Sequence, residues 1–175
     1  MNEVMKQNSV KYGVYLALVN ISYLLYAYLI DVSVFTSTWP GIILFFFGIG
    51  FGIFAVAKYK QSNDGYASFK EAFSAYILTA IVATLIGTLF TVLLFSIIDP
   101  EFATQAMDMI LEVTLERFES SGMSDEQVEQ IIERIQGSNP FGISGQLKSA
   151  AFSIMFNAII GLIVGAAMKK NNPEF

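Results

Sequence analysis

Residues 72–98 read AFSAYILTAIVATLIGTLFTVLLFSII, a run of 27 residues without aspartate, glutamate, lysine or arginine. A helix needs about 20 apolar residues to cross the hydrocarbon core of a bilayer. Three further charge-free runs, at residues 12–30, 32–57 and 149–168, are also long enough. We therefore predict an all-α, polytopic membrane protein with four transmembrane helices, at about 12–30, 39–57, 72–98 and 149–168.

The composition of the chain supports this prediction. Of the 175 residues, 54 % are apolar and only 14 % are charged, and all 25 charged residues lie outside the four runs. A soluble domain of this length has too little remaining chain to cover four wholly apolar helices. We therefore treat residues 1–175 as a single membrane domain.

Several kinds of chemistry are excluded by the residues that the chain lacks. Cysteine and histidine are absent, which rules out disulfides, thiolate and histidine metal sites, and histidine acid–base catalysis. The four runs also lack the acids and bases on which proton relays and voltage sensors usually depend. Serine and threonine without a neighbouring base are weak nucleophiles. We therefore predict that the protein is not an enzyme and has no catalytic residue, cofactor or metal.

The lysines and arginines predict the orientation of the chain, since cytoplasmic segments of membrane proteins are enriched in them. Seven of the ten lie in the N-terminal segment, the turn after the second run or the C-terminal tail: Lys6, Lys11, Lys58, Lys60, Lys70, Lys169 and Lys170. We expect a multi-pass membrane protein with both termini in the cytoplasm. The first turn and the segment 99–147 would then lie outside.

The segment 99–147 holds most of the acidic charge. It contains ten acids and two arginines, a net charge of −8. Apolar residues recur in it at helical spacing: Met107, Ile110, Leu111, Thr114 and Phe118, then Val128, Ile131, Ile132 and Ile135. Asp99 and Pro100 open the first helix, and Ser124 opens the second. We predict an extracytoplasmic pair of amphipathic helices that forms an outer cap at about 99–147.

Acids that share one helix face in this segment raise the question of a calcium site, because calcium binds several oxygen ligands. They are Glu112, Glu116 and Glu119, and no EF-hand spacing surrounds them. A solvated acidic face is the favoured interpretation.

Small and polar residues within the spans indicate how the helices pack. Gly48 and Gly52, and likewise Gly161 and Gly165, form GxxxG pairs, which let helix backbones approach closely. We favour packing within the bundle and keep an oligomer face as the alternative. The polar residues at depth are Asn20, Thr84, Thr88, Thr91 and Asn157. Burying an amide is costly without a hydrogen bond, so we expect interhelical hydrogen bonds, with a polar pathway or small ligand pocket as the alternative.

The turn between the second and third spans carries a helix-start signal. Ser68-Phe-Lys-Glu71 is a capping-box pattern, with Ser68 as the N-cap residue and Glu71 reaching back to it. Helix initiation explains this pattern, and a cytoplasmic docking site is the alternative.

Two motifs resemble a known protein family. The run 64–73, DGYASFKEAF, and the run 97–102, IIDPEF, flank the third span and look like the domain-of-unknown-function 4199 family. Membership would imply a small bacterial membrane protein, which we expect in the inner membrane, with four spans and an acidic helical segment between spans three and four. It implies no activity, so no catalytic residue can be carried over.

These features together predict a structural or accessory membrane module. It would engage a membrane-protein partner or a second copy of itself through the outer cap or the helix faces, with the lipid bilayer around it and no nucleic acid bound. The alternative is a small transporter or channel that acts as an oligomer. A continuous polar cavity would favour that alternative, and a dry interior would count against it.

Overall fold

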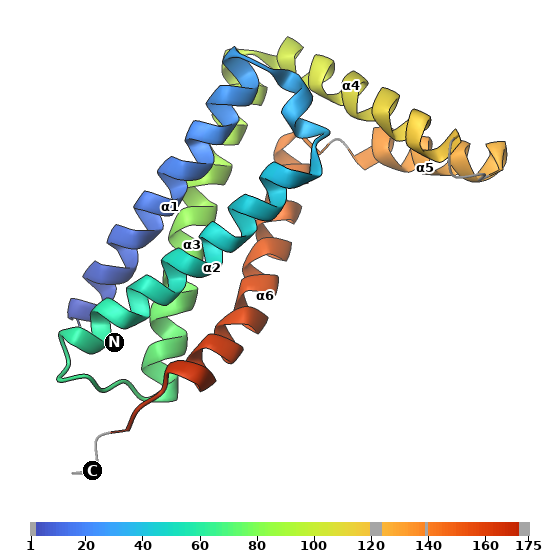
Figure 1. Ribbon diagram of the computed structural model, residues 1–175. Helices are drawn as coiled ribbons and strands as arrows, with labels where there is room; N and C mark the ends of the chain where they lie inside the picture. The colour runs from blue at the N-terminus through green and yellow to red at the C-terminus, as the bar shows by residue number, and fades with distance from the viewer. Residues whose placement is uncertain (1–2, 120–123, 139, 172–175) are drawn as a thin grey trace.

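The computed structural model describes residues 3–119, 124–138 and 140–171 (Figure 1). These residues form an all-α protein, as predicted, and no β-strand occurs among them. The elements are α1 (Glu3–Leu29), the 3-10 helix η1 (Val32–Phe35), α2 (Thr38–Gln61), α3 (Phe69–Leu93), the π-helix η2 (Leu94–Ile98), α4 (Pro100–Glu119), α5 (Asp125–Ser138) and α6 (Ile143–Met168).

Four helices are long and apolar enough to cross a membrane: α1, α2, α3 together with η2, and α6. The predicted four-span class is therefore confirmed. The helices extend beyond the charge-free runs, since α1 begins at Glu3 instead of residue 12, and α6 begins at Ile143 instead of residue 149. Backbone hydrogen bonds continue where the side chains become polar, so a charge-free run marks the apolar part of a helix and not its ends.

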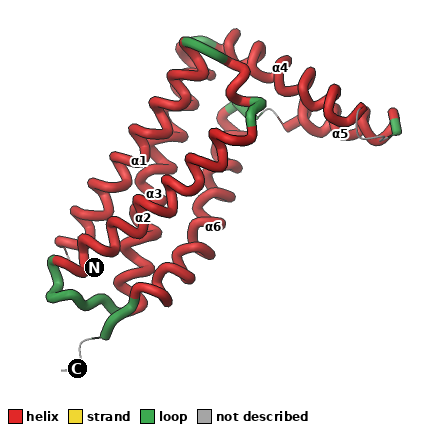
Figure 2. The backbone as a smooth tube through the Cα atoms, in the orientation of Figure 1, coloured by secondary structure: helices red, strands yellow, loops and turns green. Residues whose placement is uncertain are grey.

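Helix α3 lies at the centre of the bundle and packs against α1, α2 and α6 (Figures 1 and 2). The start of α1, the turn 62–68 and the end of α6 lie at one end of the bundle, which we call the terminal end. Helix η1 and the start of α4 lie at the opposite end, which we call the arm end. Helices α2 and α6 touch each other only slightly.

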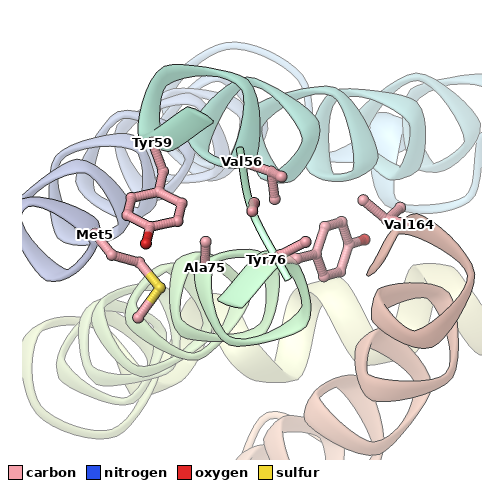
Figure 3. Packing of buried hydrophobic residues seen from close by; sticks show 8 residues of the cluster. Met5, Val56, Tyr59, Ala75, Tyr76 and Val164 are labelled. Carbon is pink, nitrogen blue, oxygen red and sulfur yellow. The ribbon is translucent and has the colours of Figure 1, made fainter. Parts of the chain in front are cut away.

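Side chains from all four long helices fill the bundle at the terminal end. Met5, Val56, Tyr59, Tyr76 and Val164 belong to one buried cluster. Figure 3 shows the Tyr76 ring pointing from α3 toward Val164 of α6, while Tyr59 of α2 points toward Met5. This end of the interior is therefore packed with apolar and aromatic groups.

The C-terminal tail is tied to the turn before α3. Ala67 and Lys170 exchange two backbone hydrogen bonds, at N–O distances of 3.0 and 2.7 Å. The Lys60 ammonium donates to the Met168 carbonyl at 2.8 Å, and the Lys170 ammonium lies 4.9 Å from the centre of the Tyr66 ring. These contacts hold the end of α6 beside the turn.

An aromatic cluster closes the arm end. The rings of Phe95 and Phe102 stack with centres 5.7 Å apart, and Phe141 meets Phe95 edge-on at 4.8 Å. Asp99 caps α4, because its carboxylate accepts from the Phe102 N–H at 3.0 Å and from the Tyr28 hydroxyl at 3.0 Å. The first turns of α4 are thereby fixed to the ends of α1 and α3.

The segment 99–147 does form a pair of helices, but the pair is not a cap over the bundle. Figure 1 shows α4 and α5 projecting sideways from the arm end, past α6. Phe102 and Ala106 of α4 are buried on the bundle, while Asp108, Glu112 and Glu116 farther along the helix are exposed. Helix α5 packs chiefly on α4. We call α4 and α5 together the arm.

Candidate functional site

A cavity of about 320 Å³ lies in the middle of the bundle, and all four long helices contribute to its wall. Its polar lining consists of Asn20 from α1, Thr84 from α3, and Ser153 and Asn157 from α6. Gly48 contributes backbone from α2. Three of the four residues that the sequence suggested as a polar lining, Asn20, Thr84 and Asn157, therefore lie around one space.

The polar side chains of the cavity differ in whether they form hydrogen bonds within the protein. The Asn157 amide oxygen accepts from the Tyr76 hydroxyl at 3.3 Å, and its nitrogen donates to the Ser153 carbonyl at 2.9 Å. The side chains of Asn20 and Thr84 make no hydrogen bond with the described residues. Their amide and hydroxyl groups therefore remain available to an occupant of the cavity.

Thr88, the fourth residue of the suggested lining, does not line this cavity. A second, smaller cavity of about 240 Å³ continues toward the arm end and shares Asn20 with the first. Thr91 and Gln146 line it, and the Thr91 hydroxyl donates to the Gly87 carbonyl at 2.9 Å. The threonines of α3 therefore do not line one continuous cavity: Thr84 lines the first, Thr91 lines the second, and Thr88 lines neither.

Tyr76 closes the bundle on the terminal side of the cavity, where two glycines make room for its ring. A Cβ atom added to Gly52 would overlap one edge of the ring, and a Cβ atom added to Gly161 would lie 2.9 Å from the other edge. The ring is therefore held between the backbones of α2 and α6. Little space remains for a polar path toward the terminal end.

The two other glycines of the GxxxG pairs behave differently from each other. A Cβ atom at Gly165 would lie 3.2 Å from both Phe69 and Phe73, so α6 approaches α3 closely there. A Cβ atom at Gly48 would meet nothing within 4 Å, because Gly48 borders the cavity. The expectation of close packing at Gly48 is therefore not met within the chain.

Phenylalanine side chains form the side of the cavity that faces the bilayer. Phe45 of α2 and Phe156 of α6 have ring centres 6.0 Å apart, and both line the cavity. They are 42 % and 41 % exposed, and the neighbouring Phe152 is 67 % exposed. Since these rings reach both the cavity and the outer surface, they form the boundary between the cavity and the lipid-facing surface between α2 and α6.

A family model described as "Protein of unknown function (DUF4199)" matches residues 11–170. The chain belongs to the DUF4199 family. No curated protein and no solved structure matches the chain. Membership in DUF4199 confirms the resemblance seen in the sequence and assigns no activity.

The chemistry available in the cavity of this DUF4199 chain is hydrogen bonding by neutral groups. Its lining contains amides, hydroxyls and hydrocarbon, and no ionisable acid or base. Such groups can orient an uncharged molecule, whereas proton transfer at neutral pH needs a titratable group. Among the described residues, no group of three or more acidic side chains is arranged to hold a metal ion.

Ser153 and Gln146 were missed in the sequence, although a signal for Ser153 was present. Ser153 lies four residues before Asn157, so both occupy one face of a helix. Gln146 lies before the charge-free run of α6, outside the predicted span 149–168.

The capping-box residues start α3 at the terminal end. The Ser68 hydroxyl accepts from the Glu71 N–H at 3.3 Å, and the Glu71 carboxylate accepts from the Ser68 N–H at 2.8 Å. Glu71 also accepts from the Tyr59 hydroxyl, which joins the start of α3 to the end of α2. Both residues are thus engaged within the fold.

Loss of this cap should have a modest effect on stability. Ser68→Ala removes the acceptor of the Glu71 N–H, and we expect the free energy of unfolding to fall by about 1 kcal/mol. Thermal unfolding in detergent measures the change. Ser62→Ala is the control, because that hydroxyl is exposed and donates only to the Lys58 carbonyl. Equal effects of the two substitutions would argue against a specific capping role.

Proposed function

We propose that this protein is a non-catalytic membrane module that engages a membrane-protein partner through the arm. The observation that carries the proposal is the position of α4 and α5, which project sideways beyond the bundle (Figure 1). The arm meets the bundle through Phe102 and Ala106 of the first turns of α4, and through the Arg117 guanidinium, which donates to the Thr36 carbonyl at 2.8 Å. A helix pair held out in this way presents a surface to a neighbouring molecule.

The charge of the arm supports a particular kind of partner. Exposed acids lie along both helices: Asp108, Glu112, Glu116, Glu126, Glu129 and Glu133. Opposite charges steer association and give it specificity. We therefore propose a partner whose segment on the same side of the membrane is basic. A second copy of the chain carries the same acidic arm, which makes direct pairing of two arms unfavourable.

The non-catalytic part of the proposal is supported by the chemistry of the spans. Histidine and cysteine are absent, and the four charge-free runs contain no carboxylate or ammonium group. The cavity offers only neutral hydrogen-bonding groups. We also propose, from the distribution of lysine and arginine, that the termini are cytoplasmic and the arm lies outside. From the resemblance to small bacterial membrane proteins, we propose that the membrane is a bacterial inner membrane.

Crosslinking in native membranes tests the role of the arm. We expect the tagged full chain to crosslink to a partner with a basic segment, identified by mass spectrometry. Neutralising three exposed acids of α5 (Glu126→Gln, Glu129→Gln and Glu133→Gln) should reduce the yield about tenfold, because electrostatic complementarity is lost.

A matched control separates the arm from net charge. It neutralises Glu3, Asp31 and Asp64, three exposed acids outside the arm, by Glu→Gln and Asp→Asn substitution. This control should crosslink as the natural chain does. Equal loss in the two variants, or capture of the chain's own copies alone, would contradict the proposal.

A small transporter or channel formed by an oligomer remains the second candidate. The two cavities that share Asn20 favour it, since they extend from the middle of the bundle toward the arm end. The packed cluster around Tyr59, Tyr76 and Met5 opposes it, because those side chains fill the terminal end. Transport would require Tyr76 to leave its place between Gly52 and Gly161.

A further inference from the structure

We infer that the cavity between α1, α2, α3 and α6 binds an uncharged lipid that carries a carbonyl group and enters from the bilayer between α2 and α6. Asn20 and Thr84 would donate hydrogen bonds to the carbonyl oxygen, and the hydrocarbon tail would leave past Phe45 and Phe156. This inference is independent of the proposed role of the arm, since the cavity and the arm share no residue.

The unpaired polar groups are the first argument. In a bilayer no bulk water is present to satisfy a polar side chain, so an unpaired amide or hydroxyl at depth is costly. Asn20 and Thr84 line the cavity without a hydrogen bond to the described residues, although Asn157 beside them is paired at both ends. The cavity therefore offers unused hydrogen bonds on two adjacent helices.

The lining determines the charge of the ligand. No aspartate, glutamate, lysine or arginine lines the cavity, so a charged headgroup would be buried without a counter-ion. The amide nitrogen of Asn20 and the hydroxyl of Thr84 are donors, which suit a neutral acceptor such as a ketone or ester oxygen. The ligand is thus an uncharged, carbonyl-bearing molecule.

The size of the cavity and its aromatic boundary indicate what the rest of the ligand is. A volume of about 320 Å³ is near the lower limit for small-molecule sites. The cavity can therefore hold the headgroup of a lipid, but its long tail must lie outside. The aromatic side between Phe45 and Phe156 provides apolar contact for a tail that continues into the bilayer. Two classes of membrane lipid have this combination, isoprenoid quinones and diacylglycerols.

Photo-crosslinking of the full chain in lipid nanodiscs tests the inference. One set of samples contains a quinone with a photoreactive tail, and a second set contains a diacylglycerol with a diazirine in its chain. We expect one of the two probes to label residues around Phe45 and Phe156 saturably, and to be displaced by its own non-photoreactive form. The probe that saturates identifies the source of the carbonyl.

Three variants locate the binding. Gly48→Leu places a side chain in the cavity, where nothing lies within 4 Å of its Cβ atom, and should abolish saturable labelling. Thr84→Val and Asn20→Leu each remove one hydrogen bond and should weaken binding by up to about tenfold. Gly50→Leu is the control, because it makes the same change on α2 outside the cavity.

Thermal unfolding of each variant is measured alongside, so that loss of binding is scored only in folded protein. Since Gly48→Leu and Thr84→Val act on different helices, failure of one variant to fold leaves the other to decide. Labelling that does not saturate, or that persists unchanged in Gly48→Leu, would show ordinary boundary lipid and overturn the inference. Absence of labelling by both probes would also overturn it and indicate that water fills the cavity.

Discussion

Gly52→Leu is expected to lower the free energy of unfolding by about 3 kcal/mol, since over-packing a well-filled interior costs this much or more. A Cβ atom at this position would overlap the Tyr76 ring, and the ring cannot move away because Gly161 holds its other edge. The melting temperature in detergent should fall by roughly 6–12 °C, from the usual relation for a chain of this length. Thermal unfolding followed by circular dichroism measures the change.

Gly50→Leu provides a closely matched control for this prediction. It lies two residues away on α2, and its Cβ atom would meet nothing within 4 Å. Its melting temperature should therefore be unchanged or slightly higher, since leucine favours a helix more than glycine does. Tyr76→Ala removes the overlap but empties a buried site, so the double variant should lose less stability than the sum of the two single losses. Equal effects at Gly50 and Gly52, or no effect at Gly52, would contradict the packing described for α2.

The spanning helices could be predicted because charged side chains are costly in the hydrocarbon core of a bilayer, so a long charge-free run indicates a span. No charged side chain lies in residues 72–98, and the structure forms α3 and η2 over nearly the same residues. Local signals were equally informative, since Ser68 and Glu71 form the capping box and Asp99 caps α4. These features depend on residues that are close together in the sequence, so they can be recognised from the sequence alone.

The packing of the glycines could not be predicted in the same way. Gly48 and Gly52 lie four residues apart on one side of α2, and nothing in α2 itself distinguishes them. The difference comes from α3, because the Tyr76 ring reaches α2 at the level of Gly52 while the cavity lies at the level of Gly48. Such a contact depends on the relative positions of two helices.

The direction of the arm is a second feature that the sequence did not contain. The pattern of apolar residues predicted two amphipathic helices after Asp99, and the structure has α4 and α5 there. Whether such a pair lies over the bundle or beside it depends on how α4 leaves the aromatic cluster of Phe95, Phe102 and Phe141. Amphipathicity fixes which face is buried, and it leaves the direction of the helix axis open.

The central claim is that the chain crosses the membrane four times, with the turn 62–68 and the arm on opposite sides. Because the chain has no cysteine, single cysteines can be placed at will. Ser62→Cys and Glu126→Cys introduce them at exposed positions of the terminal end and of α5.

Labelling of intact cells with a membrane-impermeant maleimide, before and after permeabilisation, tests this claim most directly. We expect Glu126→Cys to react in intact cells and Ser62→Cys to react fully only after permeabilisation. Reaction of Ser62→Cys alone in intact cells would reverse the proposed orientation and leave the four spans in place. Reaction of both cysteines in intact cells, or of neither, would place the turn and the arm on one side of the membrane and contradict the account.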